Sequence, residues 1–283
     1  MKVGLVVHHR RSASREAAVE AAAHLRTLGV DVAMARPDGE QPDVGVPQLS
    51  HDAFADGLDL AMSFGGDGTF LRAAHLCRGA GVPILGLNLG RLGFLADAEL
   101  DDLDEVLHAV ANRDFRIEER PTLEVWSSDS EGRRLSEDWA LNEVSIEKSA
   151  RQRILLMELH VARSRFARIP ADALVVATST GSTAYAFSAG GPILSPEVRA
   201  LLVTPVAPHS LFARTVVVGE DEQIDVEILP EQSPAIVSCD GREPVTVPAG
   251  GWVHATGGGQ PVRLARVSSI DFYGVVRTKF GLR

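Results

Sequence analysis

Cysteine is scarce in this 283-residue sequence, which contains only Cys77 and Cys239. Two cysteines are too few for a disulfide framework or for a cysteine-rich metal site. The residues around both cysteines are mainly apolar or small. We therefore expect a protein of the reducing cytoplasm.

Long hydrophobic runs are also missing. The amino-terminal run at residues 1–7 is soon followed by His8 and His9, so it is too short for a signal peptide or a membrane span. A run of this length is typical of a buried β-strand. We expect no membrane partner.

Basic residues are outnumbered, and lysine is nearly absent. The sequence has 28 Lys and Arg against 38 Asp and Glu, a formal net charge of -10, and no basic run that could neutralise the phosphates of a duplex. Nucleic acid and anionic membranes are therefore excluded as general partners. Lys2, Lys148 and Lys279 are the only lysines, so a mechanism that needs an ammonium group has few candidates.

Residues 1–118 alternate apolar runs with helical patterns. Runs at 30–35, 58–64 and 82–89 predict further buried strands, and the first helical pattern ends at Gly29, a typical C-cap. Near-continuous apolar strands that alternate with helices predict an open parallel sheet covered on both faces. An acidic helix over 101–112 closes this predicted α/β domain.

Residues 119–266 have a different hydrophobic pattern, with apolar side chains at every second position in short runs. Met157, Leu159 and Val161 alternate with polar neighbours, and turn signals such as Asp240-Gly241 separate the runs. This pattern predicts a β-rich, sandwich-like second domain. Residues 267–283 form a tail that could return to the first domain.

The pentapeptide Gly65-Gly66-Asp67-Gly68-Thr69 lies where an apolar strand ends and a helix begins. Open α/β sheets bind ligands at this position, and glycines let backbone N–H groups approach a phosphate. A carboxylate would repel phosphate unless it binds a cation, accepts a hydroxyl proton or grips a sugar hydroxyl. The presence of Asp67 therefore indicates a reaction at a hydroxyl group that lies next to a phosphate. Taken alone, the segment is equally compatible with an ordinary Asp-Gly turn.

A cluster of hydroxyl side chains follows the apolar strand at 173–176. Residues 177–185 contain five Ser or Thr side chains, which suit hydrogen bonds to phosphate or sugar without a charged lysine. A solvated Ser/Thr-rich loop is the alternative, which is weakened by the position directly after a buried strand.

Other motifs are absent or incomplete. The sequence has neither the lysine-dependent P-loop nor the Rossmann glycine fingerprint. The histidines lack metal-ligand spacing, and adjacent His8 and His9 are expected to point to opposite faces of a strand. Residues 177–181 approximate a nucleophile elbow with alanine in place of the first glycine, which leaves a serine hydrolase acting through Ser179 as an alternative.

Five segments, in this order and over most of the chain, resemble the NAD kinase family. They are Gly65 to Thr69, Asn142-Glu143, residues 172–192, Pro208-His209-Ser210-Leu211 and Asp240-Gly241. Diacylglycerol-type lipid kinases and phosphofructokinases of the wider superfamily share the first segment. The Asn-Glu pair and the hydroxyl cluster point to NAD kinase instead.

This resemblance implies transfer of the γ-phosphoryl group of ATP, or of polyphosphate in some members, to the 2′-hydroxyl of the adenosine ribose of NAD. By analogy, Asp67 is the catalytic carboxylate that orients the acceptor hydroxyl and takes its proton. A divalent metal ion, expected to be Mg²⁺, would be bound mainly through the donor phosphates, and no residue is assigned to it as a ligand. The resemblance also implies a homo-oligomer, a dimer or a tetramer.

The same resemblance implies a set of dinucleotide-binding residues. Gly68 and Arg72 would contact the dinucleotide alongside Asp67, and Asp172 would act near the nicotinamide end. Ribose and neighbouring groups would be held by Asn142 and Glu143, the adenine and ribose pocket would be lined by Thr183, Ala184, Tyr185, Ala186, Phe187 and Ser188, and Arg153 and Ala207 complete the set. No lysine is needed in this site.

Plain structural roles are also open to several of these residues. Asn142-Glu143 could be a strand-edge pair, Arg72 could form a surface ion pair, and Tyr185 and Phe187 could belong to the core.

The sequence departs from the family pattern at two positions, since Ser179 replaces the usual proline and Ala173 the usual glycine. Both changes affect loop torsions in the pocket. A dinucleotide-binding sensor without catalysis and a lipid kinase of the wider superfamily are the remaining alternatives.

Overall fold

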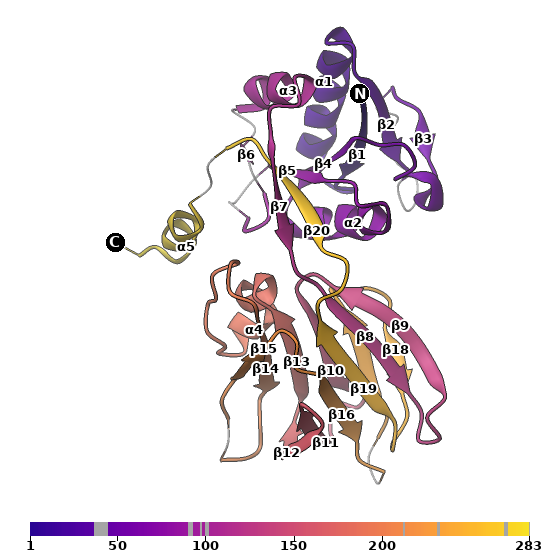
Figure 1. The fold of residues 1–283 in the computed structure, drawn as a ribbon, viewed down its shortest axis with the longest axis vertical. Coiled ribbons are helices and arrows are strands. Elements are labelled where there is room, and N and C mark those ends of the chain that lie inside the picture. Colours follow the sequence, from indigo (N-terminus) through magenta and orange to yellow (C-terminus); the bar gives the residue numbers. More distant parts are fainter. Residues whose placement is uncertain are drawn as a thin grey trace. The chain divides into compact units, whose positions relative to one another are not determined.

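The computed structural model describes residues 1–36, 45–89, 93–96, 98–99, 102–211, 213–230, 233–268 and 271–282. These residues form two compact units (Figure 1). Unit 1 contains residues 1–119 and 262–283, and unit 2 contains residues 120–261. The chain leaves unit 1 through strand β7 and returns to it through strand β20, and these two strands are neighbours in one sheet.

Unit 1 is built on a mostly parallel sheet. Among the described residues its strand order is β3-β2-β1-β4-β5-β20-β7, with β6 beside β5. The strands are β1 Lys2–Val7, β2 Asp31–Ala35, β3 Gln48–Leu49, β4 Leu60–Gly65, β5 Ile84–Asn88, β6 Ala98–Glu99, β7 Arg116–Arg120 and β20 Val262–Arg266. Every residue of β4 and β5 is buried, as expected for strands covered on both faces. The predicted α/β fold of this region is confirmed.

Helices and short 3-10 turns lie between these strands, and the last helix follows β20. They are α1 Ser12–Thr27, η1 His51–Ala53, α2 Asp67–Cys77, η2 Arg78–Ala80, α3 Leu103–Ala111 and α5 Phe272–Phe280. Gly29 has φ +77° just after α1, in agreement with the predicted C-cap. Helix α3 matches the predicted acidic helix, whose first residue, Asp101, lies outside the described residues. None of the helices in the described part of the chain is long and apolar enough to cross a membrane.

Unit 2 consists of two antiparallel sheets. One has the strand order β15-β14-β13-β10-β17-β18 and the other β12-β11-β16-β19-β8-β9. The strands are β8 Leu123–Ser128, β9 Arg134–Ala140, β10 Glu143–Lys148, β11 Leu155–Val161, β12 Ser164–Ala171, β13 Ala173–Thr178, β14 Ala200–Val206, β15 Val216–Gly219, β16 Ile224–Ile228, β17 Ala235–Cys239, β18 Val245–Val247 and β19 Trp252–Gly257. Short helices η4 Thr180–Thr183 and α4 Tyr185–Ser188 follow β13.

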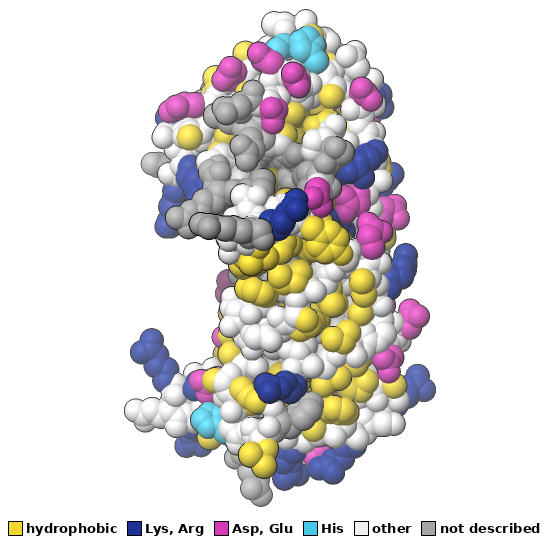
Figure 2. Space-filling model, turned by 90° about the vertical axis from the view of Figure 1, so that its left-hand side faces the viewer, with side chains coloured by type: hydrophobic (Ala, Val, Ile, Leu, Met, Phe, Trp, Pro, Cys, Tyr) yellow, Lys and Arg dark blue, Asp and Glu magenta, His cyan; other side chains and the backbone are white. Residues whose placement is uncertain are grey.

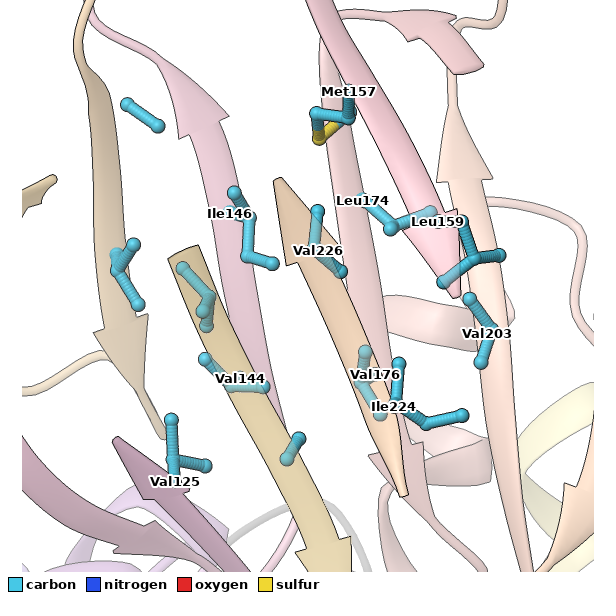
Figure 3. Close-up of a cluster of buried hydrophobic side chains, with 14 of the residues drawn as sticks. Val125, Val144, Ile146, Met157, Leu159, Leu174, Val176, Val203, Ile224 and Val226 are labelled. Atoms are coloured by element: carbon cyan, nitrogen blue, oxygen red, sulfur yellow. The ribbon is translucent and has the colours of Figure 1, made fainter. Parts of the chain in front are cut away.

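The core of unit 2 lies between its sheets, as the two-residue period predicts. Val144 and Ile146 of β10 join Met157 and Leu159 of β11 and Val226 of β16 in one buried cluster (Figure 3). The polar residues between them along each strand face away from this cluster. The predicted β-rich second region is therefore confirmed, and the sandwich holds β10 and β13 in a fixed register.

Candidate active site

Asp67 occupies the first turn of α2, directly after β4. Gly66 is the N-cap of this helix, and Gly65 ends the strand. A Cβ atom on Gly65 would lie 2.2 Å from Oγ1 of Thr69, so the chain can turn from strand to helix here only without a side chain at that position. The glycines thus place the Asp67 carboxylate at the carboxyl edge of the sheet.

The carboxylate of Asp67 is held by a second loop. Its two oxygens accept hydrogen bonds from the backbone N–H groups of Phe94, at 3.2 Å, and Leu95, at 3.1 Å. A Cβ atom on Gly93 would lie 2.2 Å from Oδ1 of Asp67, which explains the glycine there. Sequence analysis missed this loop, although it follows β5, the strand that pairs with β4. Asp67 is therefore a fixed acceptor that keeps lone pairs for a ligand.

Asp67 borders a cavity of about 490 Å³ within unit 1. The cavity is lined by His8, His9, Arg11, Gly66, Asp67, Gly68, Thr69 and Arg72. Of the predicted site residues, Asp67, Gly68 and Arg72 are thus brought together. Asp67 is the single acidic residue among these lining residues, which otherwise provide two guanidinium groups and two imidazoles.

The prediction that His8 and His9 point to opposite faces of a strand is wrong. Their rings are stacked with centroids 5.1 Å apart and an interplanar angle of 2°, and both line the cavity. Strand β1 ends at Val7, so the alternation of side chains along a strand no longer applies to these two residues. The motif search did not mark them because it considered only metal spacing.

His8 is held as a neutral imidazole. Nδ1 accepts a hydrogen bond of 3.1 Å from the backbone N–H of Arg10. Burial lowers the pKa of His8, and the charges of Arg11, His9, Arg10 and Arg72 lower it further.

In unit 2, Asn142 and Glu143 lie at the start of β10, and a carboxylate on a neighbouring turn holds this strand end. Asp240, with φ +49°, accepts hydrogen bonds from the backbone N–H groups of Leu141, Asn142 and Glu143 at 2.7, 2.8 and 3.1 Å. Sequence analysis recognised the Asp240-Gly241 turn but not this contact. Asp240 therefore positions the Asn-Glu pair.

Glu143 has an unusual electrostatic environment. Burial raises its pKa to about 8, with the carboxylate of Asp240 contributing, although the backbone N–H of Tyr185 acts in the opposite direction. Its Oε2 atom is buried and has no hydrogen-bond partner in the described part of the chain. Glu143 is thus largely protonated at neutral pH, so it can donate as well as accept a hydrogen bond.

The hydroxyl cluster is attached to the Asn142 segment. Oγ1 of Thr178 donates to the carbonyl of Leu141 at 2.6 Å and accepts from the N–H of Gly181 at 3.2 Å. A Cβ atom on Gly181 would lie 2.1 Å from the carbonyl oxygen of Asn142, so only glycine allows this approach. The loop that opens η4 is therefore fixed against β10.

The remaining predicted residues of this loop have different environments. Thr183, Ala184, Tyr185 and Phe187 are half-buried, and Ser188 is exposed. Ala186 is fully buried in a cluster with Val175, Ala177 and Leu202, so its side chain belongs to the core.

Ser179 is 2% exposed, and its hydroxyl donates to the carbonyl of Val198. This buried serine is bound to the backbone and does not have the exposed position of a nucleophile elbow.

Asp172 lies between β12 and β13 and pairs with a lysine. Nζ of Lys148 is 2.6 Å from Oδ1 of Asp172, and Nε2 of His209 is 4.0 Å from the same oxygen. A lysine thus pairs with one of the predicted site residues, because the antiparallel pairing of β10 and β13 brings Lys148 to Asp172.

Tyr185 shares this neighbourhood. Burial raises its pKa, and the negative charges of Glu147, Asp172 and Glu143 add to the rise. Two predicted residues lie in exposed connections: Arg153 in the turn between β10 and β11, and Ala207, with φ +45°, after β14.

No group of three or more His, Cys, Asp or Glu side chains within the described ranges is arranged to hold a metal ion. The carboxylate of Asp67 lines the cavity and keeps acceptor capacity beyond its two backbone hydrogen bonds, so it is suited to share a divalent cation with phosphate oxygens.

Comparison with known proteins gives matches over nearly the whole chain. Residues 3–115 match the family model for the ATP-NAD kinase N-terminal domain, and residues 141–267 match that for the ATP-NAD kinase C-terminal domain. NAD kinase 2 of Streptomyces coelicolor is 41% identical over 284 residues, covering 99% of this chain and 94% of that protein. NAD kinase of Thermobifida fusca is 44% identical over 274 residues, covering 94% and 83%.

Two solved structures share the fold. The crystal structure of an NAD kinase from Archaeoglobus fulgidus in complex with ATP has a TM-score of 0.75 and 27% identity, covering 100% of this chain and 98% of that one. Yeast NADH kinase complexed with NADH has a TM-score of 0.87 at 24% identity, covering 100% and 88%.

Proposed function

Because the chain belongs to the NAD kinase family, it phosphorylates NAD to NADP with ATP, and we propose that Asp67 is its catalytic base. The observation that carries this role is the position of Asp67 as the one carboxylate among the cationic groups that line the cavity of unit 1. The 2′-oxygen of the adenosine ribose attacks the γ-phosphorus, the bond from that phosphorus to the β,γ-bridging oxygen breaks, and ADP leaves. The hydroxyl proton passes to Asp67.

The hydrogen bonds of Asp67 support this role. Two backbone N–H groups fix the orientation of the carboxylate before substrate arrives, which is what a transfer reaction governed by positioning requires. A divalent ion, Mg²⁺ by preference, would bind through the donor phosphates with Asp67 as the available carboxylate, and it would neutralise charge on the transferred group. Gly68 and Arg72 contact the dinucleotide at the same cavity wall.

Dinucleotide binding falls to unit 2 in this proposal. Asn142 and the protonated Glu143 hydrogen-bond ribose hydroxyls, because together they offer both donors and acceptors. Asp172, oriented by Lys148, acts near the nicotinamide end. The segment from Thr183 to Ser188 forms the adenine and ribose pocket in this proposal, and the exposed residues Arg153 and Ala207 complete the binding set.

The activity is tested by incubating purified protein with NAD, ATP and Mg²⁺ and measuring NADP with an NADP-specific dehydrogenase. We expect NADP to accumulate with enzyme concentration. Binding of NAD without NADP formation would identify a sensor instead. Replacing ATP by polyphosphate and NAD by NADH in parallel reactions determines the donor and acceptor preference.

We also propose that the chain acts as a cytoplasmic homo-oligomer, a dimer or a tetramer. Hydrophobic side chains gather over part of one face of unit 2 (Figure 2), and exposed apolar residues of this unit include Val198, Leu211 and Val217. Both cysteines are free and buried, which supports a reducing compartment. Sedimentation velocity over a series of protein concentrations tests the assembly, and a monomer at every concentration would contradict it.

A further inference from the structure

His8 is the residue at which β1 opens into the cavity of Asp67. Its backbone N–H still donates to the carbonyl of Phe64 in β4, at 3.0 Å, although the strand ends one residue earlier. A Cβ atom on Gly65 would lie 3.3 Å from Cβ of His8. Contacts with β4 therefore fix the backbone and the Cβ atom of His8.

The hydrogen bond to Nδ1 determines which ring nitrogen of His8 carries the proton and can donate to a ligand. Since Nδ1 accepts from the N–H of Arg10 at 3.1 Å, a neutral ring carries its proton on Nε2. The surrounding positive charges and burial lower the pKa of His8, which keeps this tautomer at neutral pH. His8 thus offers one N–H donor and no competing acceptor at its outer nitrogen.

The neighbours of His8 make the same wall strongly attractive to anions. Arg11 and Arg72 line the cavity together with His8 and His9, and the parallel ring of His9 limits rotation of His8. Guanidinium and imidazole N–H donors replace the lysine that many phosphate sites use. A chain of linked phosphates, with several charges in a row, matches such a wall better than a single anion does.

We propose that His8 and Arg11 bind the phosphate chain of the phosphoryl donor, with Nε2–H of His8 donating to a phosphate oxygen. This assignment rests on the proposed function, since it places the donor beside Asp67. It concerns two residues of this chain that no sequence motif marked. ATP and inorganic polyphosphate share the chemistry recognised here, and separate kinetic arms distinguish them.

Variants of His8 test the position of the donor atom. The amide of His8→Asn reaches only the place of Nδ1, whereas that of His8→Gln reaches the place of Nε2. Because a hydrogen bond to a charged group is at stake, we expect His8→Asn to raise KM for ATP roughly 10-fold and His8→Gln to raise it less than about 3-fold. KM for NAD should change less than about 2-fold in both variants.

Two more variants complete the design. Arg11→Ala should also raise KM for ATP roughly 10-fold, and it removes no helix cap because the Arg11 side chain makes no capping hydrogen bond to α1. Arg15→Ala is the matched control: Arg15 is exposed on α1 but does not line the cavity, so KM for ATP should stay within about 2-fold. If His8→Asn fails to fold, Arg11→Ala still tests the wall.

Direct binding separates this proposal from the activity. Inorganic tripolyphosphate, titrated calorimetrically into each protein, should bind wild type and His8→Gln more tightly than His8→Asn. If wild type forms NADP but neither KM for ATP nor tripolyphosphate affinity changes in His8→Asn and Arg11→Ala, the assignment is wrong and the function stands. If wild type forms no NADP, the proposed function fails. A selective loss of tripolyphosphate binding in His8→Asn and Arg11→Ala would still support phosphate binding by these two residues. A rise in KM for NAD as large as that for ATP would overturn donor binding.

Discussion

Asp67 of unit 1 and Asp240 of unit 2 are held in the same way but serve different ends. Each carboxylate accepts backbone N–H bonds from a segment distant in sequence, two for Asp67 and three for Asp240. The side chain of Asp240 is only 2% exposed and lies 3.7 Å from Arg242, whereas Asp67 borders a cavity of about 490 Å³. Access to a ligand, more than the number of hydrogen bonds, separates the carboxylate proposed to be catalytic from the structural one.

Replacing Asp67 by Asn should cause the largest loss of activity of all the changes that test this comparison. The amide cannot take a proton from the acceptor hydroxyl, so we expect kcat to fall by about 10³-fold, while NAD affinity changes less than about 3-fold. NADP formation at saturating substrates and NAD titration by fluorescence measure the two quantities. A loss of kcat below 10-fold would remove Asp67 from the role of base.

Replacing Asp240 by Asn should reduce stability and leave chemistry less affected. An amide offers one acceptor oxygen to three N–H groups and adds two donors to a buried site, so we expect the free energy of unfolding to fall by about 2–3 kcal/mol. Urea denaturation of wild type and variant measures this difference. A variant of unchanged stability that lacks kcat would reverse the roles given to the two carboxylates.

The pH dependence of stability tests Glu143, which Asp240 influences. Burial raises the pKa of Glu143 to about 8 from its ordinary 4.5, so the folded state holds a proton that the unfolded state releases. The stabilisation from this proton is complete below about pH 4.5 and is lost as pH rises through 8. Relative to Glu143→Gln, wild type should lose on the order of 3–4 kcal/mol between pH 5 and pH 8.

Urea midpoints of wild type and Glu143→Gln across this pH range provide the measurement. Parallel pH profiles for the two proteins would show that Glu143 ionises normally in the folded state. In the background of Asp240→Asn the difference between the profiles should shrink, because one of the charges that raises the pKa is gone.

The smallest expected effect is the chemical modification of the two thiols in native protein, of which each unit contains one. Burial raises the pKa of Cys77 to about 12 and raises that of Cys239 as well. We therefore expect a disulfide reagent such as DTNB to leave native protein almost unmodified and to label two thiols after denaturation. In Cys77→Ser the remaining thiol, Cys239, reports the opening of unit 2, and in Cys239→Ser the remaining thiol, Cys77, reports the opening of unit 1. Rapid labelling of either thiol in native protein would contradict its burial.

Sequence analysis predicted local features more successfully than contacts between distant segments. The place of Asp67 follows from the apolar strand before it and the helical pattern after it, and these patterns are local. The contact of Asp67 with Phe94 and Leu95 depends on β4 and β5 being neighbours, which strand order determines. Asp240 reaches back to residues 141–143 for the same reason, since β10 pairs with β17.

One local prediction failed where a regular element stopped. The alternation expected for His8 and His9 requires a strand, but β1 ends at Val7. The pairing of Lys148 with Asp172 could not be read from composition, because a scarce residue type can still be placed by an antiparallel register. Boundaries and registers are thus the information that periodicity supplies least well.

Strand β20 has a consequence for synthesis on the ribosome. It lies between β5 and β7 in the sheet of unit 1, but the chain reaches it only after the whole of unit 2 has been made. A nascent chain that stops before residue 262 leaves β7 and the Ile84 end of β5 without the strand that lies between them, and unpaired strand edges are prone to aggregation. The first domain to leave the ribosome is therefore completed only after the second one has emerged.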